Sequence, residues 1–300
     1  MSEAQLRETI VDCVSEALSD SHECRQKALQ MLDSITKVSP QNRNLLAQTD
    51  AAIPVLLSLS KSSSSIIETL SLSILFNLSL NPDLKCSLAD METISHLNSM
   101  IFSSTSPESI RLASSLVCSM AMLDKNKAKF GVAGTIQLLV KAIAGSRGPA
   151  THHLLSSLVE LVQFQGNCTV AVRSGAVQVL IQIVESTDGQ DLAGTSLAVL
   201  CLLARFDERL NALRKTEQVV SVIVNVLKRR CMLSKEGAAE ILLRLFDESE
   251  GCVRDALRMP DFSSVLADLS VRGSAKAREK AALLMRKIMM EASLDSYSFQ

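Results

Sequence analysis

Two series of apolar residues repeat along this chain at a nearly constant interval. The first series recurs after 41, 42, 41, 42 and 43 residues and consists of Ile53, Ile94, Ile136, Val177, Val219 and Phe262. A second series follows each of these after 25 or 26 residues: Leu78, Met120, Leu161, Leu203, Leu245 and Ile288. Because the two series keep step over six units, they predict a protein built from repeated copies of one structural unit.

The residues between these positions predict three helices in each unit. In the first unit we expect a short helix over Asn42–Gln48, a second helix around Ile53 that starts near Pro54, and a longer third helix over Ser65–Leu80. Polar joints separate the second and third helices at one place in every unit: 62–65, 103–107, 145–149, 186–189, 228–230 and 272–274. A helical repeat near 42 residues is typical of α-solenoids. We therefore predict an all-α, right-handed α-α superhelix without β-sheet.

The boundaries of the predicted solenoid follow from the same pattern. Residues 1–40 predict two helices that cap the open end of the stack. The apolar faces of these two helices are expected to be Leu6, Ile10, Val14, Ala17 and Leu18, and Ala28, Met31, Leu32, Ile35 and Val38. Residues 41–292 hold the six full units, and residues 293–300 are expected to be a flexible tail. We predict a single domain over residues 1–292.

Composition limits the function. Apolar residues make up 47% of the chain, and the net charge of −1 argues against nucleic acid as the main partner, because phosphate contacts need a cationic surface. The first eighteen residues carry Glu3, Glu8, Asp12 and Glu16, where a secretory signal would be cationic and then apolar. Without a long apolar run we expect no membrane span. The predicted location is the cytoplasm, the nucleus or both.

The residues that could carry chemistry do not converge. The eight cysteines contain no C-x-x-C pair, and Cys118 and Cys201 stand two residues before the second series, so they are expected to be small core residues. His22 and Cys24 offer two metal ligands where a zinc site needs four. His152, Ser156 and Glu160 share one predicted helix face, but each is a full turn from the next. We expect no metal, no cofactor, no small-molecule substrate and no catalytic site.

Two surface features of the predicted solenoid each have two possible interpretations. The Ser103–Pro107 turn contains a Ser-Pro pair, which is either a phosphorylation site or simply a helix-breaking turn. The last unit is rich in basic residues, which favour an acidic protein partner or merely solubility: Arg272, Lys276, Arg278, Lys280, Arg286 and Lys287. No aromatic residue stands beside them to stack nucleobases.

Several short motifs together resemble one family. They are Ser73–Asn81 (SILFNLSLN), Leu123–Lys127 (LDKNK), Gln165–Asn167 (QGN), Val172–Val177 (VRSGAV), Ala198–Ala204 (AVLCLLA) and Gly273–Ala282 (GSAKAREKAA). In this order they resemble the armadillo region of plant U-box ubiquitin ligases, over roughly residues 41–291. No stretch resembles the U-box itself, the module that recruits the ubiquitin-conjugating enzyme in that family.

The resemblance implies that the third helices line a concave groove and that this groove binds a protein partner. At the position of the peptide-binding asparagine this chain has Asn77, Ser119, Glu160, Leu202, Arg244 and Lys287, and it has no Trp. One Asn in six does not predict an importin-like clamp on an extended peptide. The candidate groove residues are Ser73, Asn77, Arg111, Ser115, Ser119, His152, Ser156, Glu160, Glu240 and Arg244.

The function expected from these observations is a non-catalytic scaffold or adaptor, monomeric, that binds a partner protein in a plant ubiquitin-linked or signalling pathway. The alternative is the substrate-binding part of a U-box ubiquitin ligase, as a fragment or as a relative without a U-box. An enzyme is the third hypothesis, and it would require a convergent site.

Overall fold

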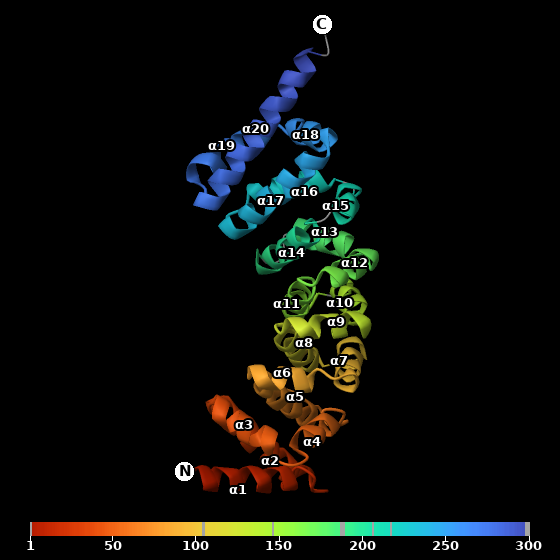
Figure 1. The fold of residues 1–300 in the computed structure, drawn as a ribbon, viewed down its shortest axis with the longest axis vertical. Helices are drawn as coiled ribbons and strands as arrows, with labels where there is room; N and C mark the ends of the chain where they lie inside the picture. The colour runs from red at the N-terminus through yellow and green to blue at the C-terminus, as the bar shows by residue number, and fades with distance from the viewer. Residues whose placement is uncertain are drawn as a thin grey trace. The chain divides into compact units, whose positions relative to one another are not determined.

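A computed structural model describes residues 2–103, 106–145, 147–186, 190–205, 207–216 and 218–297. Every regular element in these ranges is an α-helix, and they contain no strand (Figure 1). The predicted all-α class is therefore confirmed.

The helices follow one another in the predicted pattern. A pair comes first, α1 (Glu3–Glu16) and α2 (His22–Val38). Groups of a short, a middle and a long helix then succeed one another. Their bounds are α3 (Pro40–Gln48), α4 (Ala52–Leu59), α5 (Ser65–Ser79); α6 (Pro82–Leu88), α7 (Met91–Ser103), α8 (Pro107–Ala121); α9 (Asp124–Val132), α10 (Thr135–Ala144), α11 (Thr151–Leu161); α12 (Gln165–Arg173), α13 (Ala176–Glu185), α14 (Gln190–Leu203); α15 (Asp207–Arg214), α16 (Val219–Leu227), α17 (Met232–Glu248); and α18 (Glu250–Leu257), α19 (Phe262–Arg272), α20 (Ala275–Tyr297). The number of complete repeats stays a prediction of the sequence periodicity.

Helix starts follow local sequence chemistry. The hydroxyls of Ser21, Ser39 and Ser106 each accept a hydrogen bond from a backbone N–H in the first turn that follows, which satisfies donors that a helix leaves free. The second helices of two units instead follow a glycine with positive φ, Gly134 at 78° and Gly175 at 81°, a conformation that glycine adopts without steric cost. Helix α4 starts at Ala52, so Pro54 occupies its third position and not the expected first.

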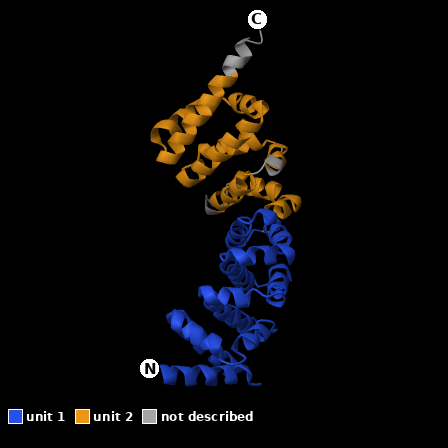
Figure 2. Ribbon diagram, in the orientation of Figure 1, with its two compact units in different colours: residues 1–167 blue, residues 168–300 orange. Residues whose placement is uncertain are grey.

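The chain divides into two compact units, residues 1–167 and 168–300 (Figure 2). The first contains α1 to α11, with α2, α5, α8 and α11 packed in series. The second contains α13 to α20, with α14, α17 and α20 packed in series. The single solenoid over residues 1–292 stays a prediction. Helix α20 continues to Tyr297, into the segment that we expected to be a tail.

The two apolar series form the interior of these units. Ile94, Ile136 and Phe262 of the first series and Leu78, Met120, Leu161 and Leu245 of the second have no solvent-exposed surface. Val177, Val219 and Leu203 are buried as well. Ile53 and Ile288 are only partly covered. The phase of the repeat, read from these residues, is therefore confirmed.

The predicted face of α2 is partly wrong. Met31 and Val38 were expected inside but are 50% and 76% exposed, whereas Leu29 is fully buried. The reason is that α2 packs against both α1 and α5, so its covered face is wider than one apolar stripe and includes the polar residues Asp33 and Thr36. Leu18, after the end of α1, is also exposed rather than buried.

Buried asparagines connect neighbouring groups of helices in the first unit. Asn126 Nδ2 donates to the carbonyl oxygens of Lys85, at 3.0 Å, and Met120, at 3.1 Å. Asn167 Nδ2 donates in the same way to Lys127 and Leu161, both at 2.9 Å. Each amide thus bonds a first helix to the first helix before it and to the end of the preceding third helix, which holds the stacking register.

No single helix in the described ranges is long and apolar enough to cross a membrane. Helices α12 and α13, with a bend of 77° between them, have the length and composition of a membrane span only when they are taken together. Parts of three predicted joints lie outside the described residues. They are residues 104 and 105 of the Ser103–Pro107 turn, residue 146 and residues 187–189.

Candidate partner-binding face

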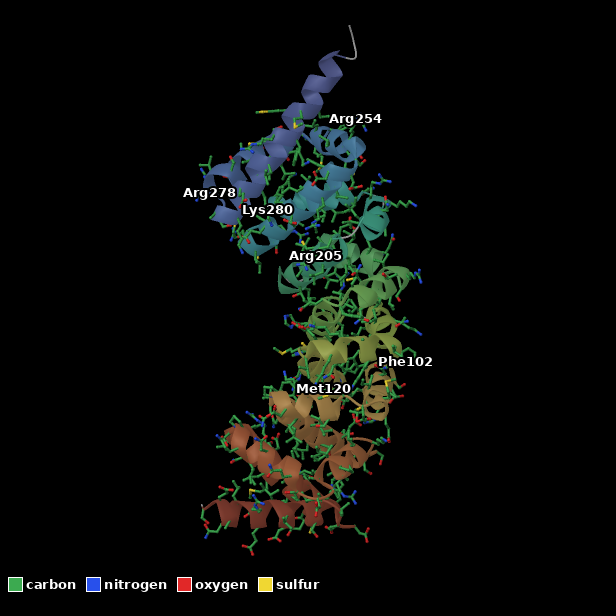
Figure 3. The ribbon with its side chains drawn as sticks, viewed as in Figure 1. Phe102, Met120, Arg205, Arg254, Arg278 and Lys280 are labelled. Carbon is green, nitrogen blue, oxygen red and sulfur yellow. The ribbon has the colours of Figure 1, made fainter. Side chains whose placement is uncertain are left out.

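We call the side of α5, α8 and α11 that carries Ser73, Arg111, Ser115, His152, Ser156 and Glu160 the third-helix face of the first unit. These helices pack in series, and α2 continues the series before α5. Their side chains are drawn in Figure 3. The expected site residues fall into two groups. In one group the polar atoms form hydrogen bonds between neighbouring helices, and in the other they remain accessible to solvent.

At the start of the face, polar side chains bond to one another between α2 and α5. Ser73 Oγ donates to Asp33 Oδ1 at 2.7 Å, and Asn77 Nδ2 donates to Asp33 Oδ1 at 3.2 Å and to Thr36 Oγ1 at 3.1 Å. Lys37 Nζ lies 2.5 Å from Asp33 Oδ2. Asn77 is 5% exposed. The polar groups in this part of the face are therefore not available to a partner, and their hydrogen bonds hold α5 against α2.

Hydrogen bonds also join α8 to its neighbours. Ser119 Oγ donates to the carbonyl of Ser79 at 3.0 Å, and Ser119 is 4% exposed. Ser115 Oγ lies 3.0 Å from Nδ1 of His153 on α11. Burial, followed by the positive charge of Arg111, lowers the pKa of His153. Because His153 is then neutral near pH 7, its ring takes part in the helix contact without adding a charge to the face.

Arg111 is the accessible cation of this face. Its Nε and Nη2 donate to the two oxygens of Glu108, at 2.8 and 2.5 Å, in a fork-like pair within α8. These hydrogen bonds hold the pKa of Glu108 below its ordinary value. The Arg111 side chain is 36% exposed and that of Glu108 54%, so a partner's charged group has access to both.

The α11 part of the face is accessible and more acidic. His152 is exposed, while Ser156 and Glu160 are partly exposed. Ser156 Oγ donates to the carbonyl of His152 at 2.9 Å, and Gln163 Nε2 donates to Glu160 Oε2 at 3.1 Å. These two hydrogen bonds join Ser156 to the backbone and Glu160 to Gln163, and neither joins two of the three side chains His152, Ser156 and Glu160.

In the second unit, Glu240 and Arg244 form an ion-pair network with Lys280 of α20, which is labelled in Figure 3. Glu240 Oε1 lies 2.8 Å from Arg244 Nη2, and Glu240 Oε2 lies 3.0 Å from Lys280 Nζ. Burial raises the pKa of Glu240, but the hydrogen bonds and charges of Lys280 and Arg244 outweigh it, and the net pKa lies below its ordinary value. The network connects α17 to α20 and leaves both basic side chains partly exposed.

Two cysteines lie beside these charged groups. Cys118 and Cys201 are partly covered, less enclosed than the expected core positions. Burial, and next the charge of Glu160, raises the pKa of Cys118 to about 11. Burial, and next the charge of Glu240, raises the pKa of Cys201 to about 11. Both thiols are therefore protonated at neutral pH and are poor nucleophiles and metal ligands.

The accessible groups of the third-helix face are polar and charged side chains. In the described ranges no three His, Cys, Asp or Glu side chains are grouped so that they could hold a metal ion. Three hollows of the first unit lie elsewhere, two near the joints between second and third helices and one between α1 and α3. The third-helix face offers Arg111, Glu108, His152 and Glu160 to a partner's polar and charged groups.

Sequence reasoning missed three residues that shape this surface. Asp33 was not considered because it stands in the predicted cap, His153 because its neighbour His152 had the expected phase, and Lys280 because it was assigned to a general basic patch. The signal for Asp33 was available, since a carboxylate on the inner side of a capping helix needs donors from the next helix. His153 and Lys280 required the packing of adjacent helices to be known.

The fold is shared with solved armadillo structures. An engineered protein matches 93% of this chain and 68% of its own length, with a TM-score of 0.79 and 19% identity. A designed armadillo repeat protein in complex with the peptide (KR)4 matches 79% of this chain and 99% of its own, with a TM-score of 0.71 and 15% identity. At such low identity these likenesses show the fold alone.

Curated relatives are plant proteins. U-box domain-containing protein 8 of Arabidopsis thaliana is 25% identical over 289 residues, which are 96% of this chain and 75% of that protein. U-box domain-containing protein 1 of Medicago truncatula is 31% identical over 116 residues, 38% of this chain and only 17% of the relative's length. The sequence model described as the plant U-box protein ARM repeat region matches residues 8–299. The chain therefore belongs to the family of plant U-box protein armadillo repeat regions.

Proposed function

We propose that this protein is a non-catalytic scaffold that holds a partner protein on its third helices. The observation that carries the proposal is the accessible charge of Arg111, Glu108 and Glu160 on helices whose other faces are buried. Long charged side chains are seldom placed beside a core unless solvent or a partner reaches them. Complementary charges on a partner would determine which proteins bind and how fast they associate.

The family supports a role linked to ubiquitin. This chain matches the sequence model of the armadillo repeat region of plant U-box proteins, and the names of its relatives refer to a U-box domain. We infer that the chain selects a protein in a plant ubiquitin-linked or signalling pathway, as a monomer in the cytoplasm or the nucleus, with no nucleic acid or membrane partner. The alternative is the substrate-binding part of a U-box ligase, favoured by the match to 75% of the Arabidopsis protein.

A charge-reversal pair tests the face. The variant Arg111→Glu with Glu160→Arg keeps the net charge and places like charges against a partner selected for the opposite signs. Its control is Lys125→Glu with Glu8→Arg, which reverses two exposed residues on α9 and α1. Tagged proteins are used to recover partners from plant extract, and the partners are quantified by mass spectrometry. We expect the first variant to lose proteins that the wild type and the control recover.

Two results would contradict the proposal. One is equal recovery of every partner by both variants while circular dichroism shows that both are folded. The other is catalysis by the chain itself. In a reconstituted assay with ubiquitin, the activating enzyme and a conjugating enzyme, we expect no ubiquitin transfer that depends on this chain.

A further inference from the structure

A wide polar hollow of about 770 Å³ lies at the edge of the first unit, away from the third-helix face. It is bounded by the turn after α4, the first turn of α5 and one side of α7. Helix α7 contributes Glu92, Ser95, His96 and Ser99, while Lys61 and Glu68 come from the other two elements. The positions 92, 95, 96 and 99 recur at helical spacing, so they form one continuous polar stripe along α7.

Glu68 is the unusual member of this lining. Its Oε1 atom is shielded from solvent and has no hydrogen-bond partner among the described residues. A carboxylate oxygen that has left water without gaining a donor raises the free energy of the folded state. Because Glu68 lines the hollow and is only partly covered as a residue, a ligand there that carries N–H donors has access to the carboxylate, which favours a positively charged donor.

The charged groups that line the hollow carry one more negative charge than positive charge. Lys61 Nζ lies 3.5 Å from Glu92 Oε1, so this ammonium is already paired with the second carboxylate. His96 Nε2 lies 2.8 Å from Ser60 Oγ, and burial followed by the charge of Lys61 lowers the pKa of His96. With the imidazole neutral near pH 7, the lining has one positive and two negative groups. The uncompensated charge is that of Glu68.

The surroundings favour a residue of a protein segment over a free cation. A second hollow of about 440 Å³ lies at the other side of α7 and is lined mainly by apolar groups, among them Ile101, Phe102 and Leu154. Phe102, labelled in Figure 3, is half exposed, and Lys141 Nζ lies 4.4 Å from the centre of its ring. The C-terminal end of α7 thus separates a polar hollow from an apolar one.

From these contacts we propose that the polar hollow binds the arginine or lysine side chain of a partner's polypeptide segment. The ammonium or guanidinium donates to Glu68, and the serine hydroxyls of α7 accept from its remaining N–H groups. An apolar residue of the same segment occupies the hollow beside Phe102. This site lies on different residues from the third-helix face, so its failure and the failure of the proposed function are separate results.

The test uses the full chain with labelled methionine methyl groups. Met100 lines the polar hollow and is the reporter, and exposed Met31 on α2 is the internal reference. N-acetylargininamide is titrated against its neutral isostere N-acetylcitrullinamide, and magnesium chloride serves as a simple cation. We expect a saturable shift of the Met100 methyl signal with the arginine compound and no comparable shift with the other two.

A matched pair of variants shows whether binding of the arginine compound depends on the charge of Glu68. Glu68→Gln keeps the size of the side chain and removes its charge. Glu23→Gln is the control, because Glu23 occupies the first turn of α2 as Glu68 occupies that of α5. Affinity for the arginine compound should fall about ten-fold or more in Glu68→Gln and stay unchanged in Glu23→Gln.

Three outcomes would overturn the proposal. They are equal shifts with the arginine and citrulline compounds, binding by Glu68→Gln that matches the wild type, and an equal response to magnesium, which would show a nonspecific cation effect. A folded Glu68→Gln variant, verified by its thermal unfolding curve, makes each outcome interpretable. If the neutral compound binds as well as the charged one, the hollow does not select charge.

Discussion

The hydroxyl of Ser73 donates a hydrogen bond of 2.7 Å to the carboxylate of Asp33, which lies forty residues earlier on α2. The same carboxylate oxygen accepts from Asn77, and the other oxygen pairs with Lys37. Asp33 is 8% exposed. The capping helix therefore contributes more than apolar cover: it supplies the acceptor for the first polar groups of the repeat array.

Replacement of Asp33 by Ala should lower the free energy of unfolding by about 1–3 kcal/mol, because Ser73 and Asn77 lose a buried acceptor. Urea denaturation followed by circular dichroism measures the change. Asp12→Ala removes an exposed carboxylate from α1 and should alter stability by no more than about 0.5 kcal/mol. Equal effects of the two substitutions would show that the Asp33 hydrogen bonds add nothing to stability.

The second prediction concerns the apolar interior. Leu161 has no exposed surface and lies at the end of α11. Leu161→Ala should destabilise the protein by about 2–5 kcal/mol, since it removes buried carbon atoms and leaves a cavity. Val132→Ala, at a position that is 84% exposed, is the control. A loss below about 0.5 kcal/mol for Leu161→Ala, measured by urea denaturation, would be incompatible with its burial.

Stability should decrease as the solution is acidified below pH 6.5. The pKa of His96 and that of His153 are lowered from 6.5 in the folded protein, by burial first and then by nearby positive charges. Between 6.5 and the lower folded pKa values, the unfolded chain binds more protons than the folded one. The contribution of each histidine is therefore complete above pH 6.5 and is lost as the pH falls through its folded pKa.

The measurement for this prediction is the free energy of unfolding at several pH values between 7.5 and 5 (roughly the range in which histidine titrates). The double variant His96→Gln with His153→Asn retains hydrogen-bonding groups in place of Nε2 and Nδ1 but has no group that titrates in this range. Its stability should depend less on pH than that of the wild type. An unchanged slope would assign the pH dependence to other groups.

Cys118 and Cys201 should resist alkylation. With thiol pKa values of about 11, roughly 0.1% of each is thiolate at pH 8, and the thiolate is the reactive form. Exposed Cys24 should react with iodoacetamide first. Peptide mass spectrometry at successive times gives the rates, and the denatured chain provides the reference in which the differences disappear. Modification of Cys201 as early as Cys24 in the folded protein would contradict the assigned environment.

The sequence was sufficient for features that depend on one helix and its period. The burial of Ile136, Leu78 and Leu161 follows from apolar residues recurring at a fixed spacing, because each repeat provides the same surroundings. The fate of Asn77 and Ser119 could not be derived in that way. Both side chains lie close enough to the neighbouring helix to form hydrogen bonds with it, Asn77 with Asp33 and Ser119 with the Ser79 carbonyl. Whether such bonds form depends on the distance between the helices.

Charged residues were placed more reliably than small polar ones. Arg111, Glu160, Glu240 and Arg244 were expected on an accessible wall, and none is fully buried. Their partners were not foreseen: Glu108 pairs with Arg111 within one helix, whereas Lys280 reaches Glu240 from α20. To predict an ion pair between two helices, one must know which of their turns lie opposite each other. The sequence of either helix alone does not contain this information.

The buried asparagines have a consequence for how such a chain changes length over evolutionary time. Asn126 and Asn167 each bond to a carbonyl one period earlier and to another six residues earlier. A gene duplication that copies one whole period keeps both carbonyl acceptors in place for the copied asparagine and for the asparagine one period later, so no buried amide loses its acceptors. A duplication of part of a period would leave a buried amide without its acceptors. Selection for folding would thus favour growth by complete units.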